Sequence, residues 1–116
     1  MATARVARGR RTEAAVAAYM AEHGWPHAER VPASLPGSDI TGTPDVAIEV
    51  KARSDFHPRA WLAQAAKNAD GRLPVTVVRM NGQGERAGEY LAFVKFSDLV
   101  DLLLEAGYGD PEQVAS

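Results

Sequence analysis

Hydrophobic and polar positions repeat along this chain with two different periods, and the changes of period predict its helices and strands. A helical repeat runs from Thr12 to His23, and Gly24 follows it as expected at a helix C-terminus. The apolar residues that share one stripe of this helix are Ala15, Val16, Tyr19 and Met20. The first predicted element is therefore a helix over 12–23.

Three short extended segments follow this helix. Residues 27–32 (HAERVP) and 39–41 (DIT) are compatible with strands, and a turn-rich loop (ASLPGS) separates them. Residues 42–45 (GTPD) are a strong turn signal. The β-branched segment 46–52 (VAIEVKA) then predicts a strand that pairs back across this turn.

The second half repeats the change from helix to strand. His57-Pro58 opens a predicted helix that runs to Ala69, and Asp70-Gly71 ends it. The continuous apolar run 73–80 predicts a strand covered on both faces. Residues 81–89 form a predicted loop, 90–96 a strand, and Ser97-Asp98 the cap of a last helix over 99–107. The order α-β-β-β-α-β-β-α predicts an α/β fold with a mixed β-sheet flanked by helices.

Length and composition indicate an ordinary globular protein. The 116 residues suit one domain, 1–116, with 46% hydrophobic and 24% charged residues. The absence of cysteine excludes disulfides and thiolate metal sites. No apolar stretch is long enough to cross a membrane. We therefore expect a soluble cytoplasmic protein of a bacterial, archaeal or phage-infected cell, with a flexible tail over 109–116.

Charge is unevenly distributed although the net charge is only −2. Residues 1–11 contain four arginines and no acid, so 1–9 is expected to be a basic N-terminal arm. Residues 98–116 contain five acids and no base. This asymmetry permits one basic and one acidic face, but a charged end is also often only solvated, so contact between the arginines and nucleic acid remains open.

The strand 46–52 carries unusual charges. Alternation puts Glu49 and Lys51 on one face of an otherwise apolar strand, and charged groups in such strands usually have a partner or a task. A hairpin about Thr43-Pro44 brings Asp39 beside Ile48 and Glu49, where the two carboxylates could share one cation. Oxygen ligands of this kind favour Mg²⁺. Lys51 would lie about 7 Å further along the same face, where its ammonium could orient a water molecule.

A second aspartate, Asp45, follows Pro44 just before this strand, but it is a less suitable metal ligand than Asp39. If Asp45 shared a strand with Glu49, the two would lie about 13 Å apart, which is too far to share a metal ion. We therefore assign the metal aspartate to Asp39 and interpret Asp45 as a turn residue.

These residues resemble the PD-(D/E)XK nucleases, and within them the small archaeal and phage Holliday junction resolvases. The family pattern is a glutamate on the first helix, an arginine on the first strand, an aspartate, and then E-x-K. The matching residues, within a resemblance over roughly 10–80, are Glu13, Arg30, Asp39 and Glu49-Val50-Lys51.

The resemblance implies a restriction-endonuclease-like core that hydrolyses DNA phosphodiesters with Mg²⁺, for which Mn²⁺ would substitute. Asp39, Glu49 and the Val50 backbone carbonyl would bind the metal, and Lys51 would position the attacking water. Glu13 and Gln64 would lie around this centre. The implied substrate is branched DNA such as a four-way junction, cut during DNA recombination by a homodimer.

Five basic residues are candidate DNA contacts, and each is also explicable as ordinary surface: Arg10, Arg11, Arg30, Arg53 and Lys67. Three alternatives stay open for the whole chain. It could cut other DNA, such as flaps, ends or duplex; it could bind DNA structures without cutting; or residues 46–52 could be an edge strand with protective charges. The three histidines have no ligand spacing, and Trp25 and Trp61 are expected in the core or at a dimer contact.

Overall fold

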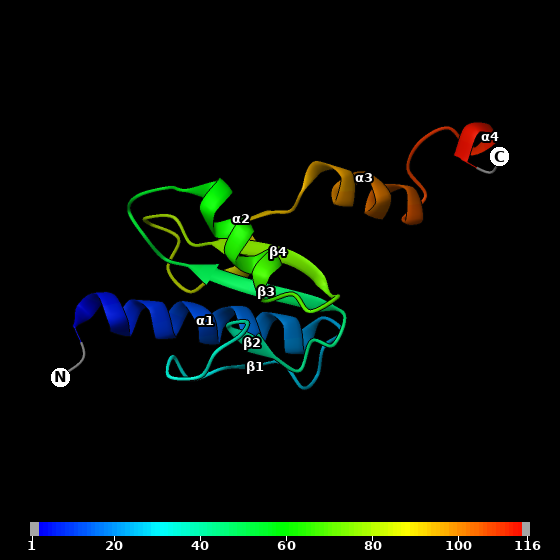
Figure 1. Ribbon diagram of the computed structural model, residues 1–116. Coiled ribbons are helices and arrows are strands. Elements are labelled where there is room, and N and C mark those ends of the chain that lie inside the picture. Colours follow the sequence, from blue (N-terminus) through cyan, green and yellow to red (C-terminus); the bar gives the residue numbers. More distant parts are fainter. Residues whose placement is uncertain (1–2, 115–116) are drawn as a thin grey trace.

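The computed structural model describes residues 3–114 as a mixed α/β architecture (Figure 1). The elements in chain order are α1 (Ala4–Glu22), β1 (Glu29–Arg30), β2 (Ile40–Thr41), β3 (Val46–Lys51), α2 (Pro58–Lys67), β4 (Leu73–Val78), the 3₁₀ turn η1 (Ala87–Glu89), β5 (Leu91–Phe93), α3 (Phe96–Glu105) and α4 (Pro111–Val114). The predicted class, helices with a mixed sheet, is confirmed. None of the helices in the described range combines the length and apolar character needed to span a membrane.

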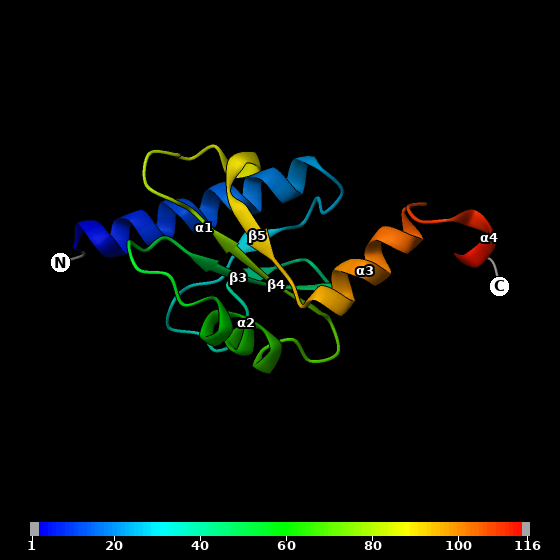
Figure 2. The same cartoon turned by 90° about the horizontal axis from the view of Figure 1, so that it is seen from above.

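The main sheet has the strand order β3-β4-β5. Strands β3 and β4 are parallel, with Glu49 opposite Thr76, whereas β4 and β5 are antiparallel. Strands β1 and β2 form a separate antiparallel pair with Arg30 opposite Ile40. Helix α1 lies on one face of the main sheet and α2 on the other (Figures 1 and 2).

The two helices bury different sides of β3. On the α1 side, the core joins Val16 and Ala17 to Ile48 and Val50. On the α2 side, Trp61 and Ala65 are buried against the sheet together with Ala47. Because alternate residues of a strand point to opposite faces, Glu49 and Lys51 lie on the same face of β3 as Ala47, which is the face toward α2.

The first helix starts earlier than predicted. It begins at Ala4 rather than Thr12, and the hydroxyl of Thr3 caps it by accepting from the Val6 backbone N–H at 3.2 Å. The expected basic arm is therefore helical over 4–9, while residues 1 and 2 lie outside the described range. The apolar stripe marked only the packed half of the helix, whereas alanine and arginine favour helix without packing.

Strand lengths and the last helix also differ from the prediction. The strands expected over 27–32 and 90–96 contain only Glu29–Arg30 and Leu91–Phe93. Lys95 occupies the N-cap of α3, and Ser97 and Asp98 lie inside its first turn, so the predicted cap is wrong. Within the expected tail, Pro111–Val114 form one helical turn, and residues 115 and 116 lie outside the described range.

Strand β4 is fully covered on one face and only partly covered on the other, whereas full coverage of both faces was predicted for 73–80. Thr76 and Val78 are fully buried, whereas Val75 and Val77 are only half-buried. Helix α3, which follows β5, points away from the sheet instead of covering this second face (Figures 1 and 2). One apolar face of the sheet is thus left partly open.

Candidate active site

Asp39 is held against the edge of β3 by two hydrogen bonds. Its backbone N–H donates to the Ile48 carbonyl at 3.0 Å, and its Oδ2 accepts from the Val50 backbone N–H at 2.7 Å. The predicted hairpin contact between Asp39 and this part of β3 is therefore present. The Val50 N–H occupies one of the two carboxylate oxygens of Asp39.

Glu49 lies beside Asp39 in a buried position. It is 3% exposed, and Lys51 Nζ lies 3.3 Å from its Oε1. Burial and, to a smaller extent, the negative charge of Asp39 together raise the pKa of Glu49 to about 7, although Lys51 opposes this effect. The two carboxylates thus form a site with more negative charge than its one nearby ammonium compensates.

Lys51 is oriented by helix α2. Its Nζ donates to Gln64 Oε1 at 3.1 Å and lies 5.9 Å from the centre of the Trp61 ring, within cation–π range. The side chains of Glu49, Lys51 and Gln64, predicted as candidates, are therefore brought together. Trp61, expected in the core, is buried and also supports the ammonium.

The donor set suits a hard divalent cation. The N–H and C=O of one strand residue point to the same side, so the Val50 carbonyl lies on the edge of β3 that faces Asp39. Two carboxylates and this carbonyl are oxygen ligands of the kind that Mg²⁺ takes with several waters. Over residues 3–114, no three His, Asp or Glu side chains come together with metal-ligand spacing, so this site would depend on two carboxylates.

Glu13 lies on α1, close enough to Asp39 for the two charges to interact. Burial raises the pKa of Glu13, and the charge of Asp39 raises it as well, while Arg30 lowers it. Arg30 Nε lies 3.4 Å from Glu13 Oε1. Arg30, a predicted DNA contact, is thus engaged with a predicted site carboxylate across α1 and β1.

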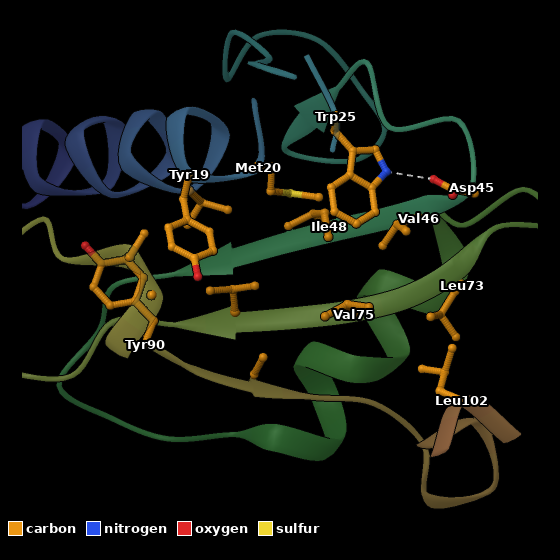
Figure 3. Close-up of a pocket in the computed structure, with 15 residues that line it drawn as sticks. Tyr19, Met20, Trp25, Asp45, Val46, Ile48, Leu73, Val75, Tyr90 and Leu102 are labelled. Atoms are coloured by element: carbon orange, nitrogen blue, oxygen red, sulfur yellow. Dashed lines mark hydrogen bonds between the residues drawn. The ribbon is translucent and has the colours of Figure 1, made fainter. Parts of the chain in front are cut away.

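Asp45 is separate from this group. It lies in the turn before β3, as predicted, and its Oδ1 accepts from Trp25 Nε1 at 3.0 Å (Figure 3). This hydrogen bond holds the turn against the segment that follows α1, and Asp45 is not among the charges that shift the pKa of Glu49.

The remaining predicted DNA contacts are surface side chains. Arg10 and Lys67 are exposed, and Arg11 Nε pairs with Glu85 at 3.3 Å. Arg53 Nε lies 2.9 Å from Asp55 Oδ1, and this hydrogen bond lowers the pKa of Asp55 to about 2. Asp55 therefore stays ionised and partly neutralises Arg53.

A basic cleft adjoins the end of β3. It has a volume of about 400 Å³, and the first turns of α1 and the loop after Lys51 line it, with Arg5, Arg8 and Arg53 among its residues. Arg5 and Arg8 belong to the N-terminal arginines whose contact with nucleic acid the sequence left open, and they were not among the five candidate DNA contacts. Their i,i+3 spacing would have placed them on one helical face had the helix been predicted from Ala4.

No family model, no curated protein and no solved structure matches this chain. The residues themselves are therefore the basis for a function. Two adjacent carboxylates, a lysine held beside them and a neighbouring basic cleft can together bind a divalent cation and an anionic substrate.

Proposed function

We propose that this protein is a metal-dependent DNA endonuclease with a restriction-endonuclease-like core. The observation that carries the proposal is the buried carboxylate of Glu49 beside the Asp39 carboxylate, with Lys51 at 3.3 Å. Burying such a charge is costly unless it has a partner or a task. A divalent cation would remove the repulsion between the two carboxylates.

In this mechanism, Asp39, Glu49 and the Val50 carbonyl would hold Mg²⁺, or Mn²⁺ in its place. The cation, when bound, polarises the phosphodiester and lowers the pKa of water. Gln64 and Trp61 hold Lys51, which orients the attacking water and stabilises the charge that develops on the phosphate. Attack of the water on phosphorus breaks one P–O bond and leaves a phosphate and a hydroxyl end.

The position of the basic cleft supports a nucleic-acid substrate. Arg5, Arg8 and Arg53 lie around the cleft that begins directly after Lys51, so a phosphate backbone could continue from the reacting phosphate into it. We propose branched DNA, such as a four-way junction, as the substrate on the basis of the resemblance to resolvases. Glu13 on α1 and Arg30 on β1, paired beside Asp39, would orient the metal site.

Cleavage of labelled four-way junction, flap and linear duplex DNA tests this proposal. Wild type is compared with Asp39→Ala, Glu49→Gln and the turn variant Asp45→Asn, in Mg²⁺, in Mn²⁺ and in EDTA. We expect paired symmetric nicks in the junction that require the metal, that Asp39→Ala and Glu49→Gln abolish, and that Asp45→Asn retains.

Other outcomes separate the alternatives. Cutting of flaps or duplex alone would keep the nuclease and replace the junction as substrate. Tight junction binding without cutting in either metal would identify a DNA-structure binding protein. Neither binding nor cutting of any DNA would refute the proposed function.

A further inference from the structure

The open face of the main sheet contains an apolar hollow. Its volume is about 650 Å³, and it lies between the second half of α1 and the strands β3, β4 and β5 (Figure 3). Its lining is almost entirely apolar and includes Tyr19, Met20, Ile48, Val75, Val77 and Tyr90. A sheet face of this kind normally packs against another element.

Helix α3, in contrast, has many apolar side chains, but none of them is buried against the rest of the protein. None of its residues is buried, and it projects beyond the body of the protein (Figures 1 and 2). Phe96 is 76% exposed and Leu103 38% exposed. The other large apolar side chains exposed on it are Leu99, Val100, Leu102 and Leu104. Monomeric soluble proteins rarely leave such a contiguous apolar patch in water.

The apolar surface of α3 is wider than one contact requires. At 3.6 residues per turn, its apolar side chains cover an arc of about 200°, whereas a helix that packs on one surface needs a stripe of roughly 100°. The remaining arc carries Asp98, Asp101 and Glu105. Such a helix has room for two apolar neighbours and keeps its three acids in water.

We propose that α3 of one copy packs into the hollow of a second copy, and that the exchange is reciprocal. The second apolar side of each α3 would then pack against the other α3 across the two-fold axis, which accounts for the wide arc. Only Leu102 of a protomer's own α3 reaches the rim of its own hollow (Figure 3). Val94 and Lys95, the two residues between β5 and α3, form a short connection that suits exchange between copies.

This assembly does not rest on the proposed nuclease activity, and its test measures mass and contacts instead of cleavage. Light scattering after size exclusion should give the wild type twice the 12.4 kDa mass of one chain. The double variant Leu99→Glu/Leu103→Glu should give the mass of one chain with unchanged far-UV circular dichroism, because neither side chain belongs to the protomer core. The matched control Asp101→Asn, on the acidic arc, should keep the doubled mass.

A crosslinking experiment identifies the occupant of the hollow. Because the chain has no cysteine, Leu103→Cys accepts a benzophenone label at a single site. The benzophenone-labelled chain, which contains ¹⁴N, is refolded with an excess of wild type that contains ¹⁵N and no benzophenone. The mixture is irradiated, and the joined peptides are identified by mass spectrometry. We expect peptides from α1 or β4 that carry ¹⁵N, joined to the ¹⁴N peptide of α3.

Two results would overturn the proposal. Hollow peptides that carry only ¹⁴N would mean that α3 closes on its own chain. A wild-type mass of one chain, or a doubled mass that survives Leu99→Glu/Leu103→Glu, would mean that α3 does not join two copies.

Discussion

Asp39 and Val50 are joined by a 2.7 Å hydrogen bond in which the side chain of the first accepts from the backbone of the second. The bond couples a loop residue to the strand that carries Glu49 and Lys51, so the position of the Asp39 carboxylate depends on the register of β3. In the proposed enzyme, this bond orients a metal ligand through one of its two carboxylate oxygens. A suitable substitution of Asp39 can therefore keep this hydrogen bond while it removes the negative charge.

Asp39→Asn should separate the two roles of this residue. Its amide oxygen can still accept from the Val50 N–H, but its negative charge is gone. We expect a melting temperature close to that of the wild type and a loss of cleavage of at least about 100-fold, measured in single turnovers. Asp45→Asn is the control, because its amide oxygen can still accept from Trp25. Loss of cleavage in Asp45→Asn with retention in Asp39→Asn would reverse the assignment of the metal aspartate.

The pKa of Glu49 predicts how stability changes with pH in the absence of metal. The pKa is raised from 4.5 to about 7, so the folded state retains a proton that the unfolded state loses between these values. Stability is therefore complete below about pH 4.5, falls as pH rises, and is lower by up to about 3 kcal/mol above pH 7. Urea unfolding in EDTA at about pH 5 and pH 8 measures this loss. Glu49→Gln should remove most of this pH-dependent loss, and Glu22→Gln, at an exposed carboxylate, should leave it unchanged. Equal losses in the wild type and both variants would contradict this explanation.

The sequence predicted this centre better than it predicted the ends of the elements. Glu49 and Lys51 stand out because they are charged residues in an apolar strand, and the turn at 42–45 determines where Asp39 returns. The strand that carries them is confirmed as Val46–Lys51. Local signals of this kind need no knowledge of distant contacts.

The parts that were wrong depend on tertiary contacts or weak local preferences. The start of α1 at Ala4 follows from helix propensity without an apolar stripe, so periodicity did not detect it. The apolar run 73–80 has the composition of a fully covered strand, but coverage of its second face depends on where α3 lies. The pairing of Lys51 with Gln64 depends on the packing of α2 against β3 and was not predicted; the family resemblance indicated only that Gln64 lies near the centre.

Metal affinity should rise with pH because the cation and a proton compete for Glu49. With a pKa of about 7, the ionised fraction of Glu49 rises about 10-fold between pH 6 and pH 8, and the apparent affinity for Mg²⁺ or Mn²⁺ should rise by a similar factor. Isothermal titration without DNA measures it. Glu49→Gln should bind much more weakly and lose the pH dependence, while Asp70→Asn, at an exposed carboxylate, should match the wild type. Equal affinity at both pH values would exclude Glu49 as a ligand.

Gln64→Ala should lower kcat by about 10- to 100-fold with little change in KM, because it removes the acceptor that orients Lys51. The more conservative Gln64→Glu, which keeps an acceptor oxygen, should recover part of the rate. Lys67→Ala, one turn further along the exposed side of α2, should instead raise KM if Lys67 contacts phosphate. A fall in melting temperature equal for Gln64→Ala and Gln64→Glu, with equal loss of rate, would point to a purely structural role.

Arg53 and Asp55 should have opposite effects on DNA binding. Asp55 stays ionised because its pKa is lowered to about 2 by the Arg53 guanidinium, so it competes with a phosphate for the same group. Anisotropy titrations of labelled junction DNA in EDTA, across a range of salt, measure the affinity and its salt slope without cleavage. Arg53→Gln should weaken binding and reduce the slope by about 1, as expected for the loss of one phosphate contact. Asp55→Asn should strengthen binding because it frees Arg53 while leaving the cleft intact. If Arg53→Gln left both affinity and slope unchanged, the DNA backbone would not enter the cleft between α1 and the loop after Lys51. This result would refute the proposed path of the substrate.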